Sequence, residues 1–354
     1  MNASKSVGRW LFIGLIMVFF QVLIGGITRL TESGLSITKW EIISGTIPPL
    51  SDEAWAKEFD LYKTTPQYKQ INEGMKLADF KFIYFWEYIH RFWARIMGFV
   101  FIIPFIIFWL KGFIIKKLMN HLFVVILLAI LAASFGWIMV ASGLIERPWV
   151  DAYKLSLHLC IAFAVFSALW WTYLQHTYNY PLAANTSVFS DKVFLLFVLL
   201  VIVQIFLGGM MSGMKIAVVY PSWPLMNGEW IPSVLADNTQ WTWNNLHEYD
   251  KNEFAPAFIQ FMHRGTAYLI AFIFVILSFR EYRFKDSVNY TPDRNLAFWM
   301  IGLVLCGQVL LGITTVLTSI GKVPVWIGVA HQGGALFLLM AIIYFIFVTN
   351  KKLH

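Results

Sequence analysis

The chain has few cysteines and few charged side chains for its length. Only two of its 354 residues are cysteine, Cys160 and Cys306, and both lie in long apolar stretches. They cannot link external loops by a disulfide or build an iron–sulfur cluster or a cysteine-based zinc site. Charged residues make up 13% of the chain and apolar residues 58%, whereas charged residues make up about a quarter of soluble domains. This composition indicates an integral membrane protein.

Eight apolar stretches are long enough to cross a bilayer, which takes about 20 residues for about 30 Å of hydrocarbon. We therefore expect an all-α integral membrane protein with eight transmembrane helices. The stretches cover residues 10–28, 82–110, 121–142, 154–175, 192–212, 256–279, 296–318 and 324–349.

Lysines and arginines cluster on one side of these spans, before the first, after the second, after the sixth and at the chain end. The positive-inside rule makes that side cytoplasmic and predicts that both termini are cytoplasmic. The long segments 29–81 and 213–255 then lie on the outer face. The start of the chain has no cleavage signal or transit peptide, which favours a bacterial inner membrane or a mature organellar chain. The net charge of +7 is explained by the flanks, so no nucleic-acid partner is expected.

The second half of the chain repeats the first. The interval from His90 to His158 (158 − 90) equals the interval from His263 to His331 (331 − 263). Gln21-Val-Leu-Ile-Gly-Gly26 resembles Gln204-Ile-Phe-Leu-Gly-Gly209. Because four spans are an even number, both halves have the same orientation. We predict two pseudo-symmetric four-helix bundles, residues 1–180 and 181–354, related by an axis along the membrane normal.

The four histidines are expected at one depth in the membrane. Each lies near the start of an even-numbered span, and all even-numbered spans run inward from the outer face. The predicted metal ligands, His90, His158, His263 and His331, therefore all lie near the outer surface. This arrangement argues against a protein that carries electrons across the bilayer, because such a carrier needs one heme near each surface.

Two imidazoles on facing helices with an apolar lining favour a heme, whose iron takes one imidazole on each axis. Arg91, Arg95 and Arg264 follow the histidines closely and are expected to meet heme propionates. Zinc is the chemical rival, but two histidines leave it short of ligands unless a carboxylate joins them. The other histidines lie at span ends, in the second long loop and at the terminus, and are read as ordinary: His121, His176, His247 and His354.

Glu87 distinguishes the two halves. It precedes His90 by three residues, so both side chains project from one face of a helix, whereas the matching residue before His263 is the neutral Gln260. A carboxylate beside one site only predicts that the first half carries out the chemistry and the second holds a cofactor. The alternative is that Glu87 only pairs with Arg91, four residues further on.

These residues and their neighbours resemble the heme A synthase family over nearly the whole chain. The resemblance is carried by Gly25-Gly-Ile-Thr-Arg-Leu-Thr-Glu-Ser-Gly-Leu-Ser36, Trp40, Gly45-Thr-Ile-Pro-Pro49, Trp86-Glu-Tyr-Ile-His-Arg91, Ser142-Gly-Leu144, Trp223-Pro-Leu-Met-Asn-Gly-Glu-Trp-Ile-Pro232, Gln260-Phe-Met-His-Arg264 and His331-Gln332.

The resemblance implies an oxidoreductase that converts the ring methyl of heme O to the formyl group of heme A for terminal oxidases. It implies that Glu87, His90 and His158 act on heme O, the substrate that becomes heme A, and that His263 and His331 hold a resident heme b. The first outer loop lacks the cysteine pair of one branch of the family, so the chain resembles the mitochondrial and alphaproteobacterial branch.

Besides the lipid bilayer, the resemblance suggests three partners: a farnesyltransferase that makes heme O, terminal oxidase assembly factors and a ferredoxin-like electron donor. The chain has no flavin, nicotinamide or cluster motif of its own. Two other readings stay open at this point. A di-heme membrane electron-transfer protein would have the same histidines without substrate chemistry, and a transporter would share the duplicated architecture.

Overall fold

The computed structural model describes residues 3–38, 47–145, 147–178, 191–284 and 291–349. Trp40, Gly45 and His354 fall outside these ranges, as do Lys285, Lys351 and Lys352, three of the basic residues after the sixth span and at the chain end. Within the described ranges the regular structure is helical, and eight helices are long and apolar enough to cross a membrane. The predicted fold class, an all-α membrane protein with eight spans, is confirmed.

The eight long helices are α1 (Ala3–Leu30), α4 (Leu77–Leu110), α5 (Lys116–Gly143), α6 (Ala152–Tyr178), α8 (Lys192–Gly213), α12 (Phe254–Phe284), α13 (Pro292–Thr318) and α14 (Val325–Thr349). Short helices lie between them: α2 (Asp52–Lys63), α3 (Pro66–Gln70), α9 (Ile216–Val219), α10 (Ser233–Ala236), the 3-10 helix η2 (Asn238–Gln240) and α11 (Trp243–His247).

Polar side chains mark where several helices begin. Asp191 accepts hydrogen bonds from the backbone N–H groups of Val193 and Phe194 at the start of α8, and the Thr291 hydroxyl accepts one from Arg294 N–H at the start of α13. Such caps satisfy N–H groups that have no partner within the helix. Asp191 also pairs with Arg280 of α12, so one carboxylate both caps a helix and ties two neighbouring helices together.

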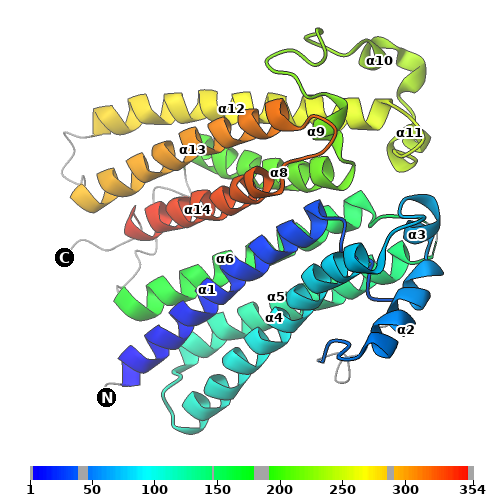
Figure 1. Ribbon diagram of the computed structural model, residues 1–354. Helices are drawn as coiled ribbons and strands as arrows, with labels where there is room; N and C mark the ends of the chain where they lie inside the picture. The colour runs from blue at the N-terminus through cyan, green and yellow to red at the C-terminus, as the bar shows by residue number, and fades with distance from the viewer. Residues whose placement is uncertain (1–2, 39–46, 146, 179–190, 285–290, 350–354) are drawn as a thin grey trace.

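The helices pack in a pattern that recurs between the halves. In the first half α4 packs on α1 and α5 packs on α6; in the second, α12 packs on α8 and α13 on α14. The halves meet where α6 contacts α8 and α1 contacts α14, and α6 also contacts α14. Figure 1 shows the eight helices side by side in one layered bundle. This packing is compatible with two pseudo-symmetric bundles; the division at residue 180 remains a prediction.

The short α-helices lie at one end of the bundle, which we call the loop end, and the start of α1 and the end of α14 lie at the other (Figure 1). Helix α2 contains the amphipathic stretch from Trp55 to Tyr62 and buries Phe59 and Tyr62 against Phe80 of α4. In the second half the segment with α9, α10 and α11 packs on α12 around Phe254. Both pairs of histidine-bearing helices are thus covered at the loop end.

Candidate histidine-pair sites

The four histidines lie in the loop-end halves of α4, α6, α12 and α14. His158 and His331 each come six residues after the first residue of their helix, Ala152 and Val325. Helix α4 begins at Leu77, five residues before the apolar stretch predicted from position 82, so His90 lies in its fourth turn. The extra turn of α4 projects from the bundle, packs under α2 and carries Phe80.

The histidines meet in the two pairs that their spacing predicts. His90 lies near His158, and His263 lies near His331. In each pair one ring comes from the second long helix of its half and the other from the fourth. Residues far apart in the sequence therefore form two similar sites at the loop end.

Each of the four rings lies against a glycine of a neighbouring helix, and at three of these glycines a larger residue would press on the ring. A methyl group at Gly25 of α1 would lie 3.2 Å from His90, one at Gly136 of α5 would lie 3.1 Å from His158, one at Gly208 of α8 would lie 3.4 Å from His263, and one at Gly312 of α13 would lie 3.1 Å from His331. The same close approach thus occurs four times, and it sets how far each imidazole reaches into its site.

The ring nitrogens are suited to metal ligation. The Nδ1 atoms of His158, His263 and His331 are buried and have no hydrogen-bond partner among the residues that the structure describes. A buried, unpaired imidazole nitrogen is costly, and coordination of a metal removes that cost. In the described ranges no third His, Cys, Asp or Glu joins either pair. A metal with two axial protein ligands, such as heme iron, therefore fits the donor set.

The Glu87 carboxylate is 2% exposed and is fully engaged at the loop end. One oxygen accepts hydrogen bonds from the backbone N–H of Ser36 (2.7 Å), the Ser36 hydroxyl (2.7 Å) and the N–H of Ile37 (2.9 Å). The other oxygen pairs with Arg91 at 2.5 Å. The pairing considered above as an alternative is therefore present. It ties the segment that follows α1 down over the first histidine pair.

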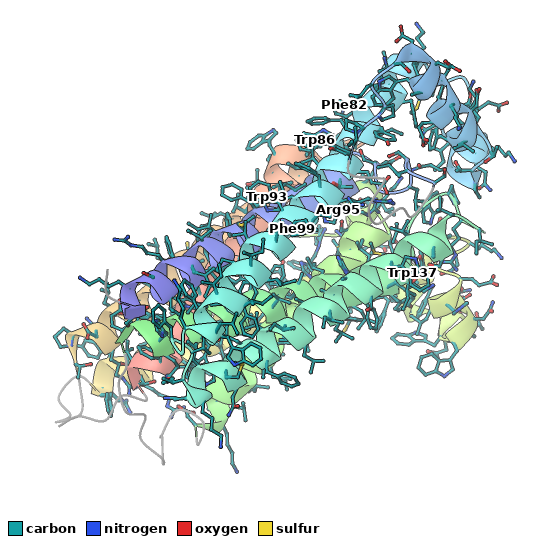
Figure 2. All side chains as sticks on the ribbon, turned by 90° about the horizontal axis from the view of Figure 1, so that it is seen from below. Phe82, Trp86, Trp93, Arg95, Phe99 and Trp137 are labelled. Atoms are coloured by element: carbon teal, nitrogen blue, oxygen red, sulfur yellow. The ribbon has the colours of Figure 1, made fainter. Side chains whose placement is uncertain are left out.

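In the second half a different set of polar side chains holds the outer loop in place. Gln260, fully buried, donates a hydrogen bond to Tyr220 O at 3.1 Å, and Arg264 donates to the carbonyl oxygens of Tyr220, Ser222, Pro224 and Leu225. Arg91 likewise donates to Ile37 O at 3.3 Å. Two of the three arginines predicted to meet propionates, Arg91 and Arg264, thus lie at the loop end, and both also hold loop segments. Arg95 lies deeper along α4, on the edge nearest α5, as Figure 2 shows.

Sequence reasoning missed a set of side chains that joins the two halves at the loop end. Arg29, at the end of α1, donates hydrogen bonds to Ser212 O (2.6 Å) and Gly213 O (2.9 Å), at the end of α8. A cation is favourable there because the last carbonyls of a helix carry partial negative charge. Arg29 belongs to a motif that we used only to establish resemblance. The role of Arg29 could have been predicted from its positive charge, because it lies at the outer end of a span.

A second polar cluster joins the halves beside α6. Arg147 pairs with Asp151 (3.1 Å) and with Asp250 (3.4 Å), and Tyr249 donates a hydrogen bond to Asp151 at 3.3 Å. Burial raises the pKa of Asp250 and the pKa of Tyr249 above their ordinary values. Asp250 also accepts a hydrogen bond from the indole N–H of Trp149. These contacts fix the start of α6, and hence His158, against the second outer loop.

Fold and site together define a class: a membrane protein of eight spanning helices with two histidine pairs at one end. Residues 8–343 match the family described as cytochrome oxidase assembly protein, and the chain belongs to that family. It is 39% identical to a heme A synthase of Sinorhizobium medicae over 95% of this chain and 87% of the relative. It is 35% identical to the heme A synthases of Wolbachia pipientis, over 99% and 94% of the two chains, and of Flavobacterium psychrophilum, over 97% and 98%. The resemblance to heme A synthases is confirmed.

Proposed function

We propose that this protein is a heme A synthase, an oxidoreductase that converts the ring methyl of heme O to a formyl group. The observation that carries the proposal is the pair of similar histidine sites that differ in one nearby residue, Glu87 in the first half and Gln260 in the second. Membership of the family and the names of its relatives support the same reaction. The product, heme A, would serve terminal oxidases.

The first half is assigned to the substrate. His90 and His158 would hold heme O between α4 and α6, and Glu87 is assigned as the essential acid. In the structure Glu87 orients Arg91 and fixes Ser36 and Ile37 above the pair. The carboxylate therefore holds a charged, ordered loop at the first site and lies one helical turn from His90, where it could exchange a proton. Arg91 and Arg95 would meet the substrate propionates.

The second half is assigned to a resident heme b, held by His263 and His331. Such a heme supplies one-electron transfer when it is bound. The protein contributes an apolar, covered site: Gln260 and Arg264 close the loop over α12, and Gly208 and Gly312 allow the two rings to approach. Because the neutral Gln260 takes the place that Glu87 has in the first half, this site is suited to holding a cofactor.

A di-heme electron-transfer protein is the second candidate, and the histidine pairs alone would serve it equally well. The charge difference between Glu87 and Gln260 favours the synthase. We further propose a bacterial inner membrane with both termini cytoplasmic, a separate ferredoxin-like electron donor, and association with the farnesyltransferase that supplies heme O and with oxidase assembly factors. The eight apolar helices establish a multi-pass membrane protein in a lipid bilayer.

Extraction and chromatography of the hemes bound to the purified protein separate the two candidates. A synthase is expected to contain heme B together with heme O or heme A, and to form heme A when heme O and reductant are added. A preparation that holds only heme B in both halves, and that leaves added heme O unchanged, would identify an electron-transfer protein.

A further inference from the structure

We propose that the side of the first half between α4 and α5 receives the isoprenoid chain of the substrate heme, and that Phe274 closes the matching side of the second half. This inference rests on the proposed function. Heme O differs from heme B by a long isoprenoid chain at one edge of the ring. A site for heme O must leave a way out for that chain, whereas a site for heme B needs none.

In the second half a phenylalanine joins α12 to α13 below the histidine pair. Phe274 follows His263 on the same helix, at an interval of 274 − 263. Its ring stacks on Phe298 of α13, with ring centroids 5.1 Å apart, and it lies where Gly302 leaves room, because a methyl group at Gly302 would be 2.9 Å from it. Helix α12 therefore contacts α13 at this ring.

In the first half the matching phenylalanine packs on a different helix. Phe101 follows His90 at the same interval, 101 − 90. Its ring lies against Gly14 of α1, 3.4 Å from where a methyl group would be, and 4.8 Å from the ring of Trp10. Helices α4 and α5, whose residues are all described, make fewer close approaches to each other than α12 and α13 do. The side of the first half is not bridged by this residue.

Phe101 and Phe274 pack on different helices because the residues at two other matching positions differ between the halves. Gly14 matches Phe197, since both precede the repeated glutamine by the same interval (21 − 14 and 204 − 197). Ile126 matches Gly302, since both precede the glycine beside a histidine by the same interval (136 − 126 and 312 − 302). In the first half α1 has room for the ring and α5 does not. In the second half Phe197 fills the place on α8, with its ring centroid 6.0 Å from that of Phe274, and α13 has the room.

Phe101 and Phe274 lie at a depth that suits contact with the isoprenoid chain of a heme rather than with its porphyrin ring. The stretch of helix from each histidine to its phenylalanine spans about 16 Å, so Phe101 and Phe274 lie about three turns deeper than the histidines. Between His90 and Phe101, the helix has open space beside Gly98. Apolar side chains on these two helices are exposed, including Ile102 on α4 and Ile130 and Trp137 on α5. Figure 2 shows Arg95 and Trp137 on this side of the molecule.

The physical consequence is a difference in selectivity between the halves. Lipid tails are as apolar as an isoprenoid chain, so a chain that leaves the first site between α4 and α5 stays in hydrocarbon and gives up nothing to water. In the second half the same chain would meet the Phe274 ring. The sites therefore sort heme O from heme B by a steric block at one position.

The test compares heme O and heme B bound to the purified full-length protein after incubation with an equal mixture of both. In a His90→Ala/His158→Ala background, Phe274→Ala should raise the bound ratio of heme O to heme B at least about tenfold, since one blocked hydrocarbon group gives roughly 10- to 200-fold discrimination. Phe272→Ala is the matched control, because it removes an exposed phenylalanine from the same helix.

The reverse change is made at the matching positions of the first half. In a His263→Ala/His331→Ala background, Gly14→Phe with Ile126→Gly should lower the same ratio at least about tenfold, while Val124→Gly, an exposed control on another face of α5, leaves it unchanged. Ratios in both variants within twofold of their controls would overturn the inference. These ratios report binding alone. A wild-type protein that makes no heme A would contradict the proposed function, but the ratios would still test where the isoprenoid chain lies.

Discussion

Glu32 and Lys215 form an ion pair between the two halves at the loop end, and they occupy matching positions in the repeat. The interval between them (215 − 32) equals the interval between Gln21 and Gln204 (204 − 21). Both have left-handed backbone conformations, with φ of 57° and 55°, which are unfavourable for residues other than glycine by about 1–2 kcal/mol. One position is acidic and the other basic, so the two matched helix ends attract each other. The two halves therefore differ in charge at the matching positions where they contact each other.

Reversal of one charge in this pair should weaken the contact between the halves, and reversal of both should restore it. The two side chains are 39% and 38% exposed, so we expect a coupling of only about 0.5 kcal/mol. Thermal unfolding of Glu32→Lys, Lys215→Glu and the double variant in detergent measures it. Equal destabilisation in the double variant and in the sum of the single variants would show that the pair contributes nothing.

The histidine pairs should differ in the heme they hold. His263→Ala or His331→Ala should remove tightly bound heme B, because loss of one axial imidazole opens a site built for two. His90→Ala should leave heme B in place. Absorption spectra and extracted heme content of the purified variants measure this. Full low-spin heme B in both second-half variants would reject the assignment of the halves.

Glu87→Gln should abolish heme A formation while protein level and heme B content stay near normal, because the amide keeps the size but neither carries charge nor exchanges a proton. The amide also weakens the hold on Ser36, Ile37 and Arg91. Limited proteolysis of the first outer loop reports that change. Wild-type heme A formation together with faster cleavage would make Glu87 an anchor of the loop only.

The outer helix α2 should lose its packing at high pH. Burial raises the pKa of Tyr62 from 10.0 to about 12; its hydroxyl donates to Gln67 and accepts from Asn72. A phenol with a raised pKa stabilises the fold fully below its ordinary pKa, and that contribution is lost as pH rises through the folded value. Between about pH 10 and 12 the wild type should therefore loosen at α2. Tyr62→Phe should remove this dependence, measured by tyrosinate absorbance and by proteolysis of the loop.

The loop end should face away from the cytoplasm. In a variant without Cys160 and Cys306, a cysteine at the exposed Glu53 should react with a membrane-impermeant thiol reagent added to whole cells. A cysteine at the exposed Arg283, on the other end of the bundle, should react only after the membrane is opened. The opposite labelling pattern would place both histidine pairs near the cytoplasm and reverse the predicted orientation.

The eight helices were predictable because crossing a bilayer demands about 20 apolar residues and internal hydrogen bonding, which leaves a helix as the form that a single span takes. The ends of these helices were harder to predict. Helix α4 extends to Leu77 because Phe80 packs under Phe59 and Tyr62 of α2, and a hydropathy pattern does not register packing on a loop. The histidine pairs could be predicted because duplication left the same spacing twice.

The surroundings of Glu87 show the limit of such reasoning. Helical spacing placed Glu87, His90 and Arg91 close together, and the ion pair with Arg91 follows from local geometry. That Ser36 and Ile37 saturate the other oxygen depends on how the chain after α1 folds back over α4. No periodicity encodes a contact of this kind between segments that lie far apart in the sequence.

By itself, the sequence determined the class of protein, the eight spans, the duplication and the two histidine pairs. Membrane crossing requires an apolar composition, and a duplication leaves the same residue spacing twice, so both can be recognised without a structure. Only the tertiary structure decided which way Phe101 and Phe274 pack, how Arg29 reaches the end of α8, and that Glu32 meets Lys215. Each of these depends on the room that a glycine or the end of another helix leaves at a particular place. Such room belongs to the packed helices together and cannot be assigned to any stretch of sequence alone.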